Sequence, residues 1–318
     1  MNLNSGIGGF LELEGNPYSF YPNAVELNSG RNALRYIIRV NAYSSLAIPR
    51  YICPAVPQAL KNEGCRIVYY SIDENLCPLD APQEPIPLLY VNYFGLKSKV
   101  ARHLSSTRSR LILDNSQSFF FNSAGIDALY SPRKFFGVPD GGYAIVNNKS
   151  LSLTLKQDCS NGRCSHLLQR AEGDLEQGYS NFLLNEVLIE SLPLQAMSVV
   201  TKRLLSMINY MRCAQKRREN FAILHDELGA LNMLSLKLEV DDVPLVYPLL
   251  LPGDSSRAKE KLLHMKIFIP TFWSGMLETE NMQAFERSLE SNLLPLPLDH
   301  RYSREEVAYV ARCVISSL

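Results

Sequence analysis

Short apolar runs alternate with amphipathic stretches in the first half of the chain. Helical spacing of apolar residues predicts helices over 29–41, 55–62 and 97–105. Runs of apolar and β-branched residues predict strands at 46–48, 66–70, 88–92, 111–113, 128–130 and 142–146. Several of these runs are apolar throughout, which is typical of strands that are covered on both faces. The pattern therefore predicts an α/β fold, with a mostly parallel sheet flanked by helices.

The second half of the chain is first helical in pattern and then mixed. Residues 183–234 indicate helix and include the basic run Lys216-Arg217-Arg218, which we interpret as a solvated helix face. Beyond about residue 243 the pattern predicts strands at 245–251 and 267–269 and helices at 256–264 and 303–316. Ser303 and Glu306 have the spacing of a capping box. We expect a large domain over 1–236 and a small C-terminal α+β domain over 237–318.

Composition narrows the class of protein. The 32 Lys and Arg residues balance 32 Asp and Glu residues, which argues against a nucleic-acid partner. No apolar run reaches the roughly 20 residues that cross a bilayer, and no secretory signal is visible. The seven cysteines include no CxxC pair, and their odd number favours a reducing compartment over a disulfide framework or a zinc site. We expect a cytoplasmic protein with no nucleic-acid, membrane or metal partner.

Three segments carry candidate chemistry. The run Asn28-Ser29-Gly30-Arg31 opens the first helix, where free backbone N–H groups and the helix dipole suit a phosphate. Asp114 ends an apolar strand, at the edge where parallel sheets bind ligands. Lys134 stands among aromatic residues and glycines, where desolvation would lower its pKa and make the amine a nucleophile. Taken singly, each segment also fits a purely structural interpretation. Residues 28–31 could open an ordinary capped helix, Asp114 could start an Asx turn, and Lys134 could be a surface lysine in a loop.

Taken together, the three segments are the parts of a pocket for pyridoxal 5′-phosphate (PLP). The lysine would form a Schiff base, the aspartate would hold the pyridinium nitrogen protonated, and the helix start would grip the phosphate. A further glycine-rich run, Gly6-Ile7-Gly8-Gly9, neither follows a strand nor opens a helix, so it lacks the context of a dinucleotide fingerprint. Both a flexible loop and a loop close to a ligand fit that run.

The motifs resemble those of the DegT/DnrJ/StrS family of PLP-dependent sugar aminotransferases, which have the aspartate aminotransferase (type I) fold. Residues 29–34, Ser-Gly-Arg-Asn-Ala-Leu, match the family's Ser-Gly-Thr-x-Ala-Leu, with Arg31 in place of Thr. Asp114 and Gln117 match an acidic residue followed three positions later by Gln or His. Lys134 is followed by Asp140, Gly141 and Gly142 at the family's spacing. Residues 92–95 and the C-terminal stretch 294–303 are weaker matches.

The resemblance implies a role for each matching residue. Lys134 would be the Schiff-base lysine, Asp114 would pair with the pyridine nitrogen, and Gln117 would lie near the phenolic oxygen of the ring. Ser29, Gly30 and Arg31 would hold the phosphate, the last two through backbone N–H groups.

Some positions depart from the family pattern. Leu129 replaces a phosphate-binding serine, so Ser131 or Arg133 would take its place. Tyr51 or Cys53 would stack on the ring. Asn181 is a candidate for the asparagine that reaches the phosphate of the neighbouring subunit.

The resemblance also implies an activity. The chain would be a homodimeric PLP-dependent aminotransferase that moves an amino group from glutamate to a keto sugar in amino-sugar and polysaccharide biosynthesis. Its sheet would be of the seven-stranded type. Two alternatives stay open: an aminotransferase for a substrate that is not a nucleotide sugar, and a non-catalytic ligand-binding or regulatory protein. Dehydratases of the family generally carry His in place of Lys134, so the lysine favours transamination.

Overall fold

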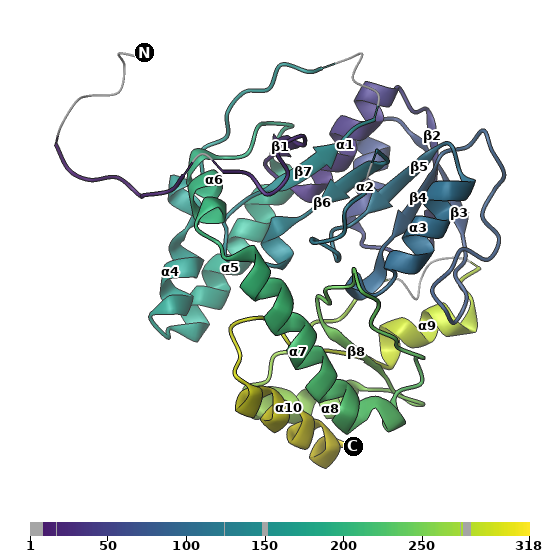
Figure 1. The fold of residues 1–318 in the computed structure, drawn as a ribbon, viewed down its shortest axis with the longest axis vertical. Helices are drawn as coiled ribbons and strands as arrows, with labels where there is room; N and C mark the ends of the chain where they lie inside the picture. Colours follow the sequence, from purple (N-terminus) through teal and green to yellow (C-terminus); the bar gives the residue numbers. More distant parts are fainter. Residues whose placement is uncertain (1–8, 17, 124, 148–151, 274, 276–280) are drawn as a thin grey trace.

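The computed structural model describes residues 9–16, 18–123, 125–147, 152–273, 275 and 281–318 (Figure 1). A seven-stranded sheet in the order β1-β7-β6-β5-β4-β2-β3 forms its centre. The strands are β1 (Val25–Leu27), β2 (Ser45–Pro49), β3 (Arg66–Tyr70), β4 (Leu88–Val91), β5 (Leu111–Asp114), β6 (Asp127–Tyr130) and β7 (Gly142–Ile145). The pairs from β3 to β6 are parallel, and β7 is antiparallel to both of its neighbours. The mostly parallel sheet predicted from the sequence is confirmed.

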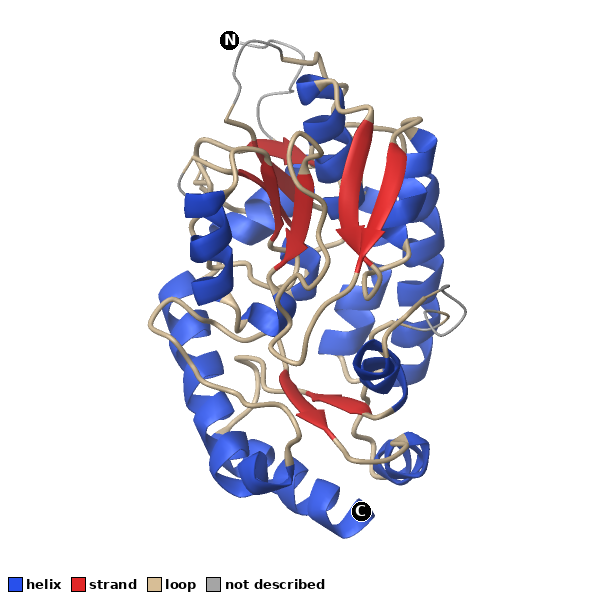
Figure 2. Ribbon diagram, turned by 90° about the vertical axis from the view of Figure 1, so that its right-hand side faces the viewer, coloured by secondary structure: helices blue, strands red, loops and turns tan. Residues whose placement is uncertain are grey.

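Helices cover both faces of this sheet, as Figure 2 shows. The helices α1 (Gly30–Asn41), α2 (Ala55–Asn62) and α3 (Ser98–Thr107) lie between successive strands of the chain. Four further helices follow the sheet: α4 (Ser165–Ala171), α5 (Leu175–Ser191), α6 (Val199–Ser206) and α7 (Tyr210–Leu228). The inner strands β4, β5 and β6 are buried at every residue, because helices shield them on both sides.

A smaller unit follows α7 (Figure 1). It consists of the antiparallel pair β8 (Tyr247–Leu250) and β9 (Leu293–Leu296) with helices α8 (Ser256–His264), α9 (Ala284–Ser291) and α10 (Arg304–Ser317). The capping box of Ser303 and Glu306 is present at the start of α10. The long helix α7 contacts both β8 and α10 and so connects the small unit to the rest of the chain. A domain boundary at residue 236 stays a prediction.

Two sequence expectations are wrong. Residues 267–269 form no strand, because the N–H groups of Lys266 and Ile267 turn back to the carbonyls of Leu263 and Leu262 and close helix α8. Arg217 does not lie on a solvated face, because its side chain is 1% exposed. Among the described helices and strands, four were not expected, namely β1, α4, α9 and β9. The glycine-rich run is described only at Gly9, which is exposed. None of the described helices combines the length and the hydropathy that a bilayer crossing requires.

Candidate active site

The predicted aspartate and lysine meet at the carboxyl edge of the sheet. Asp114 is the last residue of β5 and is 3% exposed. Its Oδ1 accepts a hydrogen bond of 2.9 Å from the backbone N–H of Ser116. The Ser116 hydroxyl in turn lies 3.3 Å from Lys134 Nζ, which donates to it. One serine therefore links the two groups, and the sequence analysis did not single it out, although it stands two residues beyond Asp114.

A short 3₁₀ turn, η2 (Pro132–Lys134), carries the lysine. The turn is closed by hydrogen bonds from Lys134 N to Ser131 O (3.2 Å) and from Phe135 N to Pro132 O (2.9 Å). Phe135 is buried, whereas Lys134 is exposed. The predicted desolvation of Lys134 is not observed, because the turn directs the aromatic residues into the core and leaves the lysine at the surface.

The start of helix α1 lies beside this turn. Ser29 is the N-cap, and its hydroxyl accepts from Asn32 N at 3.1 Å. A Cβ placed on Gly30 would lie 3.3 Å from Ser131 Cβ. The helix start that the sequence assigns to a phosphate is thus adjacent to Ser131, three residues before the lysine. Free N–H groups and a hydroxyl at one place are the donor set that a phosphate prefers.

The glycine pair after Asp140 explains how the helix start comes so close. Gly142 begins β7, and a Cβ there would lie 2.2 Å from Ser29 O and 2.7 Å from Gly30 N. Only a residue without a side chain allows this approach. Asp140 itself is fully buried and accepts hydrogen bonds from Ser198 N (2.9 Å) and Ser198 Oγ (2.7 Å) at the start of α6. Burial raises the pKa of Asp140. Its role here is structural.

Buried polar atoms without partners indicate where a ligand would fit. Gln117 is fully buried, and its Oε1 accepts from Phe94 N at 2.7 Å. Its Nε2 has no hydrogen-bond partner, and neither has Nδ2 of the buried Asn115. A buried donor without a partner costs free energy, so each one calls for a partner that the chain does not supply. Such atoms also occur elsewhere, for example Ser71 Oγ. Those of Asn115 and Gln117 stand out because both residues closely follow Asp114 in the chain. The free amide of Gln117, three residues after Asp114, is a donor at the position that the family resemblance places near the phenolic oxygen of the ring.

The arginine side chains near this edge point to helix α5 instead. Arg31 donates to Ile189 O at 3.5 Å and lies 3.6 Å from a carboxylate oxygen of Glu190. Arg133 pairs with Glu186. A phosphate at the helix start would therefore meet the backbone of Arg31 rather than its side chain, and Arg133 already has a counterion.

Tyr51, a residue predicted to stack on the cofactor ring, is packed inside the protein against other aromatic residues. It is fully buried, and its hydroxyl donates to the carbonyl of Phe272. Its ring lies against Tyr93 at a centroid distance of 5.9 Å and against Trp273 at 5.0 Å. Stacking on a cofactor ring stays a prediction for Tyr51, and these neighbours argue against it. Asn181 donates to Gln169 at 2.8 Å within the same chain.

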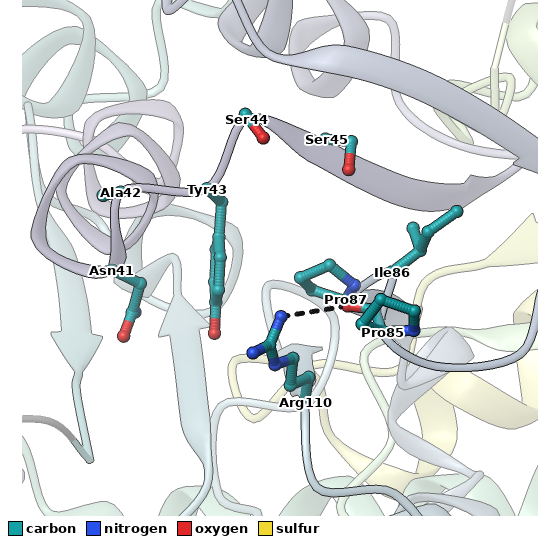
Figure 3. A pocket seen from close by; sticks show the side chains of 9 residues that line it. All are labelled: Asn41, Ala42, Tyr43, Ser44, Ser45, Pro85, Ile86, Pro87 and Arg110. Carbon is teal, nitrogen blue, oxygen red and sulfur yellow. Dashed lines mark hydrogen bonds between the residues drawn. The ribbon is translucent and has the colours of Figure 1, made fainter.

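A cavity of about 450 Å³ opens at the opposite edge of the sheet, where β2 and β4 begin (Figure 3). None of the residues predicted for the site lines it. Its lining residues are Asn41, Ala42, Tyr43, Ser44, Ser45, Pro85, Ile86, Pro87 and Arg110. Arg110 already donates to Pro85 O at 3.1 Å, as the dashed line in Figure 3 indicates. Within the described residues, no group of three His, Cys, Asp or Glu side chains is placed to hold a metal ion.

Comparison with known proteins defines the fold. No family model and no curated protein sequence matches the chain. Solved structures share its fold over 92–93% of its length. A DegT DnrJ EryC1 StrS aminotransferase from Brucella abortus is 12% identical, with a TM-score of 0.61 over 92% of this chain and 85% of that one. The sugar aminotransferase CalS13 from Micromonospora echinospora is 14% identical, with a TM-score of 0.63 over 93% and 88%.

A third similar structure was solved in a PLP-form. It is Spr1654 from Streptococcus pneumoniae, which is 15% identical and has a TM-score of 0.65 over 93% of this chain and 88% of that one. The fold is therefore that of the DegT-type aminotransferases, as the motifs indicate. The predicted fold class, the type I fold of PLP-dependent transferases, is confirmed.

Proposed function

We propose that this chain is a PLP-dependent aminotransferase that acts on a keto sugar. The observation that carries the proposal is the link from Asp114 through Ser116 to Lys134, in a fold shared with sugar aminotransferases. The adjacent start of α1 supplies the phosphate site, and the unpaired amide of Gln117 supplies a donor for the ring. These groups come from three separate segments, namely the start of α1, residues 114–117 and residues 131–134, so their convergence is not a consequence of sequence proximity.

The residues present fit the cofactor. When bound, PLP supplies an electron sink that makes the Cα–H bond of an amino acid acidic. The Asp114 carboxylate would hold a proton on the ring nitrogen, and the amine of Lys134 would bind the cofactor covalently. Once released by the amino donor, Lys134 Nζ would carry the proton to and from the donor Cα. The helix start and Ser131 would hold the phosphate and so keep the cofactor within reach of Lys134.

The substrates follow from the resemblance to the family. We propose glutamate as amino donor and a keto sugar as acceptor, with a nucleotide-linked sugar as the first choice. This would place the protein in amino-sugar and polysaccharide biosynthesis. A cytoplasmic location stays a prediction.

We also propose that the protein is a homodimer and that helix α5 forms part of the interface. Val187 on this helix is 67% exposed, and large apolar neighbours share its exposed face. These neighbours are Tyr179, Leu183, Leu184 and Leu188, with Leu168 on α4 beside them. Exposed apolar side chains that gather on one surface often mark a protein–protein interface. Since Arg31 and Arg133 both contact α5, an interface there would lie next to the phosphate site.

A charged substitution tests the dimer. Val187→Asp should lower the molar mass measured by light scattering from that of a dimer to that of a monomer. Met211→Asp is the matched control, because Met211 is 85% exposed on a different helix and should leave the mass unchanged. A wild-type protein that is monomeric would refute this part of the proposal.

The activity is tested at Lys134. Wild-type protein mixed with PLP and reduced with borohydride should carry a pyridoxyl group on Lys134, detected by peptide mass spectrometry. Glutamate should convert the bound PLP to the pyridoxamine form. Lys134→Ala should lose the adduct and at least about a hundredfold in rate, the lower range for general acid–base catalysis. Lys99→Ala, at an exposed lysine on α3, should change neither.

Two observations also fit a second function. Arg31 and Arg133 are paired with α5, and Lys134 is exposed, as expected for a pocket that binds without catalysis. The same experiment separates the two functions. Binding of PLP without conversion by any amino donor would favour a non-catalytic ligand-binding protein.

A further inference from the structure

The cation Arg217 is buried between the segment that carries Lys134 and the segment that orients Gln117. It extends from helix α7 and is 1% exposed. Burial lowers its pKa to about 10, so it is still protonated at neutral pH. A charged side chain is seldom buried this completely unless most of its donors are used. Both terminal nitrogens of Arg217 donate to carbonyls, and its Nε has no partner among the described residues.

The first contact of Arg217 is with the residue that follows Lys134. Its Nη2 donates to Phe135 O at 3.4 Å, and its guanidinium carbon lies 4.6 Å from the centroid of the Phe135 ring. The carbonyl and the ring of one residue are therefore held by the same guanidinium. Because Phe135 closes the η2 turn, this fixes the end of the turn from which Lys134 projects.

The second contact is with the segment 243–245. Nη1 of Arg217 donates to Pro244 O at 3.1 Å and to Leu245 O at 3.0 Å. Leu245 N donates to Phe94 O at 2.8 Å, and Phe94 N donates to the Gln117 side chain. The segment 243–245 also packs closely on the 3₁₀ turn η1 (Tyr93–Gly95), because a Cβ on Gly95 would be 2.4 Å from Val243 O.

We propose that Arg217 is a positioning residue: it fixes the position of Lys134 relative to Gln117 in the proposed PLP site. This inference rests on the proposed function. One planar guanidinium donates to both segments at once, which an ammonium group cannot do with the same geometry. Arg217 has no hydrogen bond to the lysine or to the glutamine side chain, so it acts on Lys134 through Phe135 and on Gln117 through Leu245 and the turn η1.

Three variants on one helix test the proposal. Arg217→Met removes the hydrogen-bond donors of the guanidinium. Arg217→Lys keeps the positive charge but cannot donate to both segments with the same planar geometry. Leu224→Ala, at a fully buried residue of α7, is the control that lowers stability without touching Phe135. Arg218→Met is a second control, because Arg218 binds the carbonyls of Glu239 and Asp242 instead. Wild type and all variants are measured at a temperature below the thermal midpoint of the least stable variant.

The first readout is the dissociation constant of PLP from its visible absorption, with the yield of pyridoxyl-Lys134 after borohydride. Arg217→Met should raise the dissociation constant of PLP about tenfold, which corresponds to about 1.4 kcal/mol. The dissociation constant of Arg217→Lys should lie between those of Arg217→Met and wild type. Leu224→Ala and Arg218→Met should match wild type. Equal affinities for Arg217→Met and Leu224→Ala would overturn the proposal.

The second readout needs no cofactor. In the protein without PLP, Arg217→Met should speed hydrogen exchange at the amides of Lys134 and Phe94, and Arg218→Met should not. Unchanged exchange at both amides would also overturn the proposal. If wild type forms no adduct on Lys134, the proposed function fails, whereas the exchange result still decides whether Arg217 couples the two segments.

Discussion

Gly142 is the position where the fold and the candidate site depend most directly on one missing side chain. Replacing it with Ala would place a Cβ 2.2 Å from Ser29 O, 2.3 Å from Ser29 C and 2.7 Å from Gly30 N. Each of these atoms is backbone, so no side-chain rotation relieves the overlap. β7 is paired on both sides, with Leu27 opposite Gly142 in β1, and so the strand cannot move away either.

The expected cost follows from these contacts. The start of α1 must shift outward by an ångström or so, which breaks the hydrogen bond of 3.0 Å from Gly141 N to Asn28 O. Overpacking costs about 1–3 kcal/mol, and the lost hydrogen bond adds about 1 kcal/mol. We expect Gly142→Ala to lose about 3 kcal/mol, which would lower the thermal midpoint by roughly 5 °C or more in a chain of this size.

The assay is thermal unfolding followed by circular dichroism, with a matched glycine as control. A Cβ on Gly137 would lie 3.6 Å from Leu167 Cδ2, which is an ordinary contact. Gly137→Ala should therefore have the same thermal midpoint as wild type. Gly142→Ala should in addition bind PLP more weakly, since the displaced helix start belongs to the proposed phosphate site. A midpoint for Gly142→Ala that equals that of Gly137→Ala would refute the steric argument.

Two further predictions concern stability. Burial raises the pKa of Asp140 above 3.8, so its contribution to stability is full below that pH and is lost as pH rises through the raised pKa. In urea unfolding across pH, the advantage of wild type over Asp140→Asn should therefore shrink as pH rises, and an advantage that grows would contradict this assignment. Ser303→Ala removes the capping box of α10 and should cost about 1 kcal/mol, measured as a lower thermal midpoint. Ser316→Ala, at the other end of the helix, is its control, and equal losses in both would rule out a capping effect.

Much of the fold could be predicted from the sequence because the signals are local. The helix over 55–62 and the helix over 256–264 match the structure at both ends, and the strand 66–70 does so as well. Apolar periodicity and end signals such as Ser303 operate within a few residues, so a single sequence displays them. The short strand β1 carries no comparable signal, since its pairing with β7 joins segments more than a hundred residues apart.

The candidate site also has a part that the sequence predicts and a part that only the tertiary structure shows. Asp114, Lys134 and the start of α1 were chosen from the sequence because each stands at the end of an element, and their types suit one chemistry. That Ser116 joins two of them depends on how β5 and η2 meet, which no spacing reveals.

Arg217 shows most clearly what only the tertiary structure decided. In sequence it belongs to a basic run, and its neighbour Lys216 is indeed partly exposed. Yet the buried positions of α7 recur at helical spacing and include Cys213, Arg217 and Phe221. A charge on that stripe is stable only if carbonyls from distant segments point at it, and Phe135, Pro244 and Leu245 do so. The sequence determined which residues are available, and packing between distant segments determined which of them are buried and what they hold.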